Sequence, residues 1–173
     1  MLAGDEAWMY LQATTLAAWS LRGVTPIVRV DPGRQKIGFY GTLNLKTGAE
    51  LVTRTLEFNS ETAAVHLELI LTTYPQVNIR LWWDRAPWHG GAAVQALLEA
   101  NPRLELVKFP VAAPDLNPQE QVWKHTRRKV SHNHLLPKLA PLADEFESYL
   151  KTTIFRTNFL ERYGYTLVCP FLN

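Results

Sequence analysis

A change of pattern partway along the chain is the feature that most limits the folds open to it. Lys36–Leu45 and Ala49–Phe58 read as two strands joined by a short hairpin turn. The pattern then changes to helix, strand, helix, strand, with the strands over Asn78–Trp83 and Leu104–Phe109. The first of these two is apolar enough to be buried on both faces. Hairpin-linked strands followed by strand–helix crossovers predict one mixed sheet with helices on its faces.

The other expected elements follow from caps, breakers and helical spacing. The first strand is expected over Ala7–Ala13, with a start as early as Leu2, and a second strand over Thr25–Val30. Asn59 and Ser60 are candidate caps of the first helix. Helices are expected over residues 59–73, from 89 or 90 to 100, and over 116–130, 141–155 and 156–163. The chain of 173 residues, 47% apolar and 20% charged, predicts a single globular domain over residues 1–173.

Three carboxylates fall on three different elements of this scheme. Asp5 lies in the first strand-like segment, and Asp84 ends an apolar strand. Glu120 lies just inside the helix that follows the rigid turn Pro114–Pro118. Acids from two strands and one helix can share two divalent ions, and Mg²⁺ prefers carboxylate oxygens and water as ligands. The pattern therefore indicates a metal-dependent site for phosphoryl-transfer chemistry.

Each of these residues also has a purely structural interpretation. Asp84 could be a turn residue or a helix cap, and His89 could cap a helix. Asp5 could be a solvated residue near the chain start, and Glu120 could simply favour the helix dipole. The sequence contains no Cys/His cluster at zinc spacing and no glycine-rich phosphate loop, which disfavours those two kinds of site.

A basic stretch follows Glu120 directly. Between positions 124 and 138 the chain has five Lys or Arg residues, three His residues and no acid. The formal net charge is only +2, so this positive charge is local. A solvated helix face would explain the stretch, and a bound DNA backbone would require one like it.

The cysteine content and the lengths of the apolar runs bear on the cellular compartment. The single cysteine, Cys169, cannot form an internal disulfide, which favours a reducing, cytoplasmic setting. No apolar run approaches the ~18–20 residues needed to span a bilayer, and no signal peptide is evident. We therefore expect no membrane partner.

Taken together, these motifs resemble those of mariner-like DDE transposases of the bacterial insertion-sequence branch. Leu81–His89 resembles the motif of a strand, Asp-Asn-Ala, two residues and His, with Arg85 where the family usually has Asn. Pro114–Trp123 resembles Ser-Pro-Asp-Leu-Asn-Pro-Ile-Glu followed by Trp. Gly4–Glu6 and the Trp, Arg-Gly and Pro of residues 19–26 resemble the first catalytic Asp-Glu and the stretch after it.

The resemblance implies an α/β fold, an RNase H-like mixed sheet of about five strands with helices on both faces. Asp5, Asp84 and Glu120 fall on the three catalytic, metal-binding positions, so two Mg²⁺ or Mn²⁺ ions are the expected cofactors. Positioning roles are expected for His89, Asn117 and Glu6. DNA contacts are expected from Arg85, Lys124, Arg127, Arg128 and Lys129.

The resemblance also implies the reaction and the partners. Family enzymes nick DNA at transposon ends with water, and the freed 3′-OH then attacks target DNA, typically at a TA dinucleotide. The expected partners are transposon-end and target DNA, bound by a homodimer in the bacterial cytoplasm and at the nucleoid. The family's N-terminal helix-turn-helix pattern is not found within residues 1–173. Two alternatives stay open: an inactive or adapted DNA-binding relic, and another RNase H-like nuclease.

Overall fold

Five strands form one mixed sheet in the order β3-β2-β1-β4-β5. The computed structural model describes residues 1–11, 19–25, 27, 34–110, 116–132 and 138–155. The strands are β1 (Leu2–Tyr10), β2 (Lys36–Asn44), β3 (Glu50–Thr55), β4 (Ile79–Trp83) and β5 (Leu104–Lys108). β1 pairs antiparallel with β2 and parallel with β4, so the pairing changes from antiparallel to parallel at the central strand. This is the mixed sheet that the sequence predicts.

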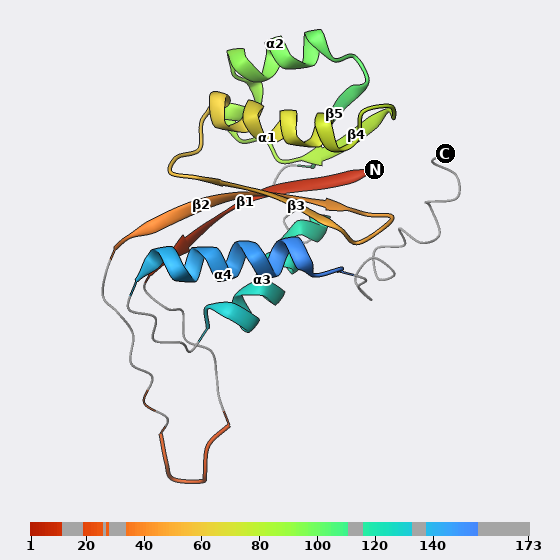
Figure 1. The fold of residues 1–173 in the computed structure, drawn as a ribbon. Coiled ribbons are helices and arrows are strands. Elements are labelled where there is room, and N and C mark those ends of the chain that lie inside the picture. Colours follow the sequence, from red (N-terminus) through yellow and green to blue (C-terminus); the bar gives the residue numbers. More distant parts are fainter. Residues whose placement is uncertain (12–18, 26, 28–33, 111–115, 133–137, 156–173) are drawn as a thin grey trace.

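Helices cover both faces of the sheet, as expected (Figure 1). They are α1 (Ser60–Thr73), the short 3-10 helix η1 (Pro87–Gly90), α2 (Ala92–Ala100), α3 (Pro118–Val130) and α4 (Leu139–Thr152). α1 and α2 lie on one face, and α3 and α4 on the other. Phe39 and Tyr40 are neighbours on β2 and both are fully buried, but they belong to different hydrophobic cores because successive strand residues point to opposite faces. Within the described ranges, no helix has the length and apolar character needed to cross a membrane.

Helix α1 begins where its cap residues predict. The side chain of Asn59 accepts a hydrogen bond from the backbone N–H of Thr62, and the Thr62 hydroxyl accepts one from the backbone N–H of Asn59. His66 lies in the middle of α1 and is fully buried, with its ring nitrogens 2.8 Å from the hydroxyls of Thr42 and Thr53. Burial lowers the pKa of His66 to about 3, so the ring is neutral and joins α1 to β2 and β3.

Some elements differ from the prediction. β4 is not buried on both faces, because Arg80 is exposed and forms a 2.7 Å ion pair with Glu105 on the edge strand β5. The expected helix start at residue 89 or 90 is a 3-10 turn, and α2 begins only at Ala92. Most of the expected strand over Thr25–Val30 lies outside the described residues, as do the expected helix over 156–163, Cys169 and Pro114.

Candidate active site

Asp5 lies on the central strand with its side chain packed under α3. The residue is 9% exposed, and its Oδ2 accepts a hydrogen bond from Trp123 Nε1 at 3.1 Å. Burial raises the pKa of Asp5 well above its usual range, and nearby negative charges raise it further. These charges belong to Glu120, Glu6 and Asp84. A buried carboxyl among other carboxyls is an environment that a bound cation would stabilise.

Glu6 points to the opposite face of β1 from Asp5, because side chains alternate along a strand. Its Oε1 atom lies 2.6 Å from Nε2 of His89 and accepts a longer bond of 3.5 Å from the indole N–H of Trp88. The side chain of Glu6 is 7% exposed. The side chains of the two consecutive acids of β1 therefore lie on opposite faces of the sheet.

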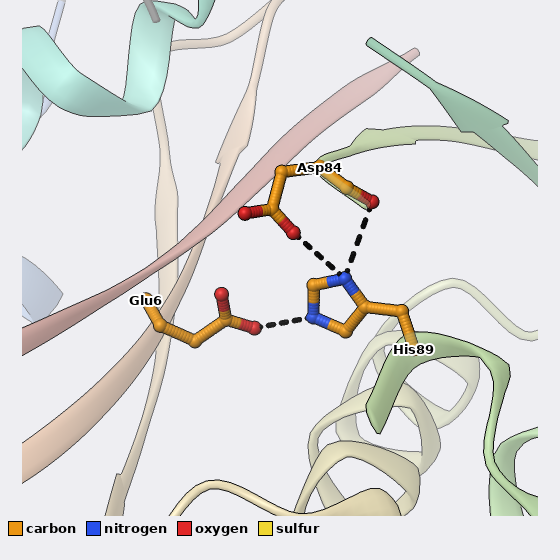
Figure 2. A group of neighbouring side chains, drawn as sticks. All are labelled: Glu6, Asp84 and His89. Carbon is orange, nitrogen blue, oxygen red and sulfur yellow. Dashed lines mark hydrogen bonds and ion pairs between the residues drawn. The ribbon is translucent and has the colours of Figure 1, made fainter. Parts of the chain in front are cut away.

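His89 connects Glu6 to Asp84, as Figure 2 shows. Its Nδ1 lies 2.9 Å from Asp84 Oδ1, and its ring stacks on Trp83 with centroids 3.7 Å apart. Burial opposes a charged ring, but the hydrogen bonds to Asp84 and Glu6 outweigh it and raise the pKa of His89 to about 9. His89 is therefore protonated at neutral pH and donates from both nitrogens, and its bond to Asp84 lowers the pKa of that carboxyl.

One cluster of possible metal ligands differs from the set of three carboxylates that the sequence predicts. Among the residues that the structure describes, Glu6, Asp84 and His89 place one ligand atom each within 4.8 Å of the others. Asp5, Asp84 and Glu120 form no such cluster within those ranges, although the charges of Asp84 and Glu120 act on Asp5. Because His89 is protonated, it acts in this cluster as a positive counter-charge for two carboxylates.

Asn117 fixes the start of α3 beside Asp5. Its side-chain oxygen accepts a hydrogen bond from the backbone N–H of Gln119 at 3.1 Å, and its amide donates to the carbonyl of Gly4 at 3.2 Å. These two bonds cap the helix and tie it to β1 at the residue before Asp5. Glu120 consequently lies in the first turn of α3, half-buried, at the positive end of the helix dipole.

Trp123 has a role that sequence reasoning misses. Its position three residues after Glu120 and its 1% exposure fit a core residue, and its ring stacks on Phe146 of α4. Its indole N–H, however, donates to Asp5, a residue 118 positions away. The Glu-x-x-Trp spacing is the only signal for this contact in the sequence, because spacing of three residues places both side chains on one side of a helix.

The expected DNA-contacting residues lie at the surface. Arg85 is exposed and its Nε donates to the carbonyl of Phe109 at 3.1 Å, which links the ends of β4 and β5. Arg127 is half-buried and donates to the carbonyl of Trp8 at 3.3 Å. The exposed cations of α3 are Lys124, Arg128 and Lys129. α3 thus presents positive charge to solvent directly after its acidic first turn.

Comparison with known sequences identifies a family. A family model described as DDE superfamily endonuclease matches residues 1–142. The insertion element IS630 uncharacterized 39 kDa protein of Shigella sonnei is 27% identical over 153 residues, which cover 86% of this chain and 43% of that protein. The chain therefore spans less than half the length of that relative.

Solved structures show the same fold. The Mos1 transposase paired-end complex with left transposon end is similar with a TM-score of 0.67 at 15% identity, over 94% of this chain and 53% of that one. The catalytic domain of Mos1 mariner transposase is similar with a TM-score of 0.59 at 15% identity, over 94% of this chain and 78% of that one. A Mos1 paired-end complex with Mg is also similar, with a TM-score of 0.63 at 16% identity, over 97% of this chain and 54% of that one. These likenesses confirm the expected RNase H-like fold.

Proposed function

The chain belongs to the DDE superfamily of endonucleases, and from this premise we propose that residues 1–173 act as the single catalytic domain of a DNA transposase. The domain would cleave DNA at transposon ends and transfer the freed strand to target DNA. The observation that carries the proposal is the collection of negative charge around the buried carboxyl of Asp5. Such charge is costly without a cation and suits a site for divalent metal.

Asp5, Asp84 and Glu120 are the residues that would hold two Mg²⁺ or Mn²⁺ ions. Their carboxylate oxygens are the hard ligands that these ions prefer, and the raised pKa of Asp5 is the behaviour of a carboxyl whose charge is uncompensated. When bound, the ions would stabilise the attacking and leaving oxygens of the phosphodiester. Similar solved structures of Mos1 paired-end complexes contain Mn or Mg, which supports the use of divalent metal.

The neighbouring residues would orient these carboxylates. Trp123 donates a hydrogen bond to Oδ2 of Asp5 and would hold that carboxylate in one orientation. His89 holds one oxygen of Asp84, and its other nitrogen is held by Glu6, so neither ring nor carboxylate rotates freely. Asn117 would set the direction of the first turn of α3 through its bonds at the helix start.

DNA would be the macromolecular partner. Lys124, Arg127, Arg128, Lys129 and Arg85 would contact phosphates, which supplies affinity without reading sequence. The substrates would be transposon ends and a TA-containing target, bound by a homodimer. Similar solved complexes of a transposase with its transposon end support DNA as the partner class.

A plasmid-nicking assay with Mg²⁺ or Mn²⁺ tests the proposal. Glu120→Gln, Asp5→Asn and Asp84→Asn are each expected to abolish nicking, because the amide is a poor ligand for these ions. Glu61→Gln is the matched control, since Glu61 is an exposed acid in the first turn of α1. Equal nicking by the wild type and Glu120→Gln would sink the assignment, and DNA binding without nicking would identify a DNA-binding relic.

Glu6→Gln separates the predicted carboxylate set from the cluster around His89. If Asp5, Asp84 and Glu120 hold the metal, Glu6→Gln should lower nicking by about 10–100-fold, because His89 is then held less firmly in its orientation toward Asp84. Measurable activity should remain. Complete loss with Glu6→Gln and retained nicking with Glu120→Gln would instead assign the metal to Glu6 and Asp84.

A further inference from the structure

A second buried carboxyl, Glu50, lies beneath the first turn of α3. Glu50 is the first residue of β3 and is 6% exposed, and Gln119 of α3 is fully buried. Nε2 of Gln119 donates a hydrogen bond to Oε1 of Glu50 at 2.5 Å. No cation among the described residues forms an ion pair with Glu50. A carboxyl this deep in the protein therefore has an amide as its side-chain partner.

The other two polar atoms of this pair have no partner in the described part of the chain. Oε2 of Glu50 and Oε1 of Gln119 are both buried and accept no hydrogen bond. A carboxylate has no proton to donate, but a protonated carboxyl has one O–H donor. Protonation of Glu50 would let that O–H donate to Oε1 of Gln119 and give both orphaned atoms a partner. Burial raises the pKa of Glu50 well above its usual range and outweighs the hydrogen bonds from Gln119 and the backbone of Thr42, which lower it; the charge of Asp5 adds to the rise.

The backbone of β2 lies directly against this pair. A Cβ at Gly41 would come within 2.5 Å of Gln119 Nε2 and 2.6 Å of Glu50 Oε1. Gly41 is the register partner of Asp5, so the Glu50–Gln119 pair and Asp5 lie on the same face of the sheet. The absence of a side chain at position 41 allows α3 to approach the sheet at this point.

We propose that Glu50 and Gln119 form a neutral acid–amide pair with two hydrogen bonds, which fixes the rotation of α3 and so directs Glu120 toward Asp5. Successive helix residues differ by about 100° in direction, so an anchored Gln119 also determines the direction of Glu120. Glu50 and Gln119 are positioning residues in this scheme. The role assigned to Glu120 rests on the proposed function, whereas the neutral pair does not.

Three variants test the pair. Glu50→Gln keeps the shape and neutral charge and supplies an N–H donor in place of the O–H. Gln119→Leu leaves the carboxyl of Glu50 without its amide. The double variant Glu50→Leu/Gln119→Leu replaces both polar groups by apolar ones, which can be nearly neutral for stability. The measurements are the urea midpoint, the infrared band of a protonated carboxyl, and the affinity for Mn²⁺ by calorimetry.

The proposal makes a distinct prediction for each variant. Glu50→Gln should keep the wild-type urea midpoint and Mn²⁺ affinity and lose one protonated-carboxyl band. Gln119→Leu should lower the midpoint. The double variant should recover the midpoint but bind Mn²⁺ about 10–100-fold more weakly, because the polar anchor at Gln119 that fixes the rotation of α3 is then lost.

Other outcomes would overturn the proposal in separable ways. Glu50 would be ionised if the Glu50→Gln protein were as unstable as Gln119→Leu. The same conclusion would follow if Glu50→Gln left the infrared spectrum unchanged. Wild-type Mn²⁺ affinity in the double variant, or a wild type that binds no Mn²⁺, would remove the positioning role. A wild type that binds Mn²⁺ but nicks no DNA would refute the transposase function and leave the pair intact.

Discussion

Trp123→Phe isolates the single hydrogen bond that joins α3 to Asp5. The substitution keeps an aromatic ring in a site that is 1% exposed and removes the indole N–H that lies 3.1 Å from Oδ2 of Asp5. Without this donor the carboxylate form of Asp5 is less stable, so the pKa of Asp5, already raised by burial, should rise further. Metal binding, which requires the deprotonated carboxyl, should weaken in consequence.

The expected magnitude follows from the charge on the acceptor. A hydrogen bond to a charged group contributes about 1.5–3 kcal/mol, and each 1.4 kcal/mol corresponds to about tenfold in an equilibrium constant. Loss of the bond to Asp5 should therefore weaken Mg²⁺ or Mn²⁺ binding by roughly 10–100-fold. The acidic limb of the nicking activity should also move to higher pH, because more of Asp5 is protonated at any given pH.

Nicking measured against Mg²⁺ concentration and pH, together with urea denaturation, provides the assay. Phe146→Leu is the matched control, because Phe146 stacks on Trp123 in the same core. Both variants should lose stability, but only Trp123→Phe should need more metal. If Trp123→Phe kept the wild-type metal requirement, the indole N–H would have no role beyond packing.

Three further predictions concern other parts of the molecule. His89→Gln should lower stability most below pH 6.5 and progressively less as the pH rises through about 9. The His89 ring, whose pKa is raised to about 9, stabilises the fold only while it is charged. Urea midpoints measured at several pH values check this. Gly41→Ala should lower the urea midpoint by the equivalent of about 1–3 kcal/mol through overpacking, whereas Gly90→Ala, with nothing within 4 Å of its new Cβ, should leave it nearly unchanged. Replacing the exposed cations of α3 by alanine should weaken DNA binding in a titration and reduce the salt slope by about 0.9 for each phosphate that is no longer neutralised. These cations are Lys124, Arg128 and Lys129.

Local features of the fold can be read from the sequence because their causes are local. The cap of α1 at Asn59 and the mixed sheet follow from short patterns of polarity and turn residues, and so does α3, although it begins at Pro118 and not at the expected residue 116. The exposure of Arg80 does not follow from such patterns, because the position of β4 next to an edge strand depends on the whole sheet order. Propensity alone does not specify that order.

Contacts within the site could not be predicted, because they join residues that are far apart in sequence. Glu6 pairs with His89 for two reasons. The pleat of β1 directs the Glu6 side chain to the opposite face of the sheet from Asp5, and the 3-10 helix after β4 places His89 on that same face. The contact of Gln119 with Glu50 likewise requires the register of β3 against β2 and the docking of α3. Side chains that look unremarkable in the sequence acquire partners only when the elements assemble.

The chain order of the acidic site has a consequence during protein synthesis. Asp5 is synthesised before Trp123, which donates a hydrogen bond to it and follows 118 positions later. β1 also lacks its parallel neighbour until Leu81 has been added. At ~5–20 residues per second, roughly 6–24 s separate the synthesis of Asp5 from that of Trp123. The three carboxylates proposed for DNA cleavage therefore cannot come together until α3, which carries Glu120, has been added to the growing chain.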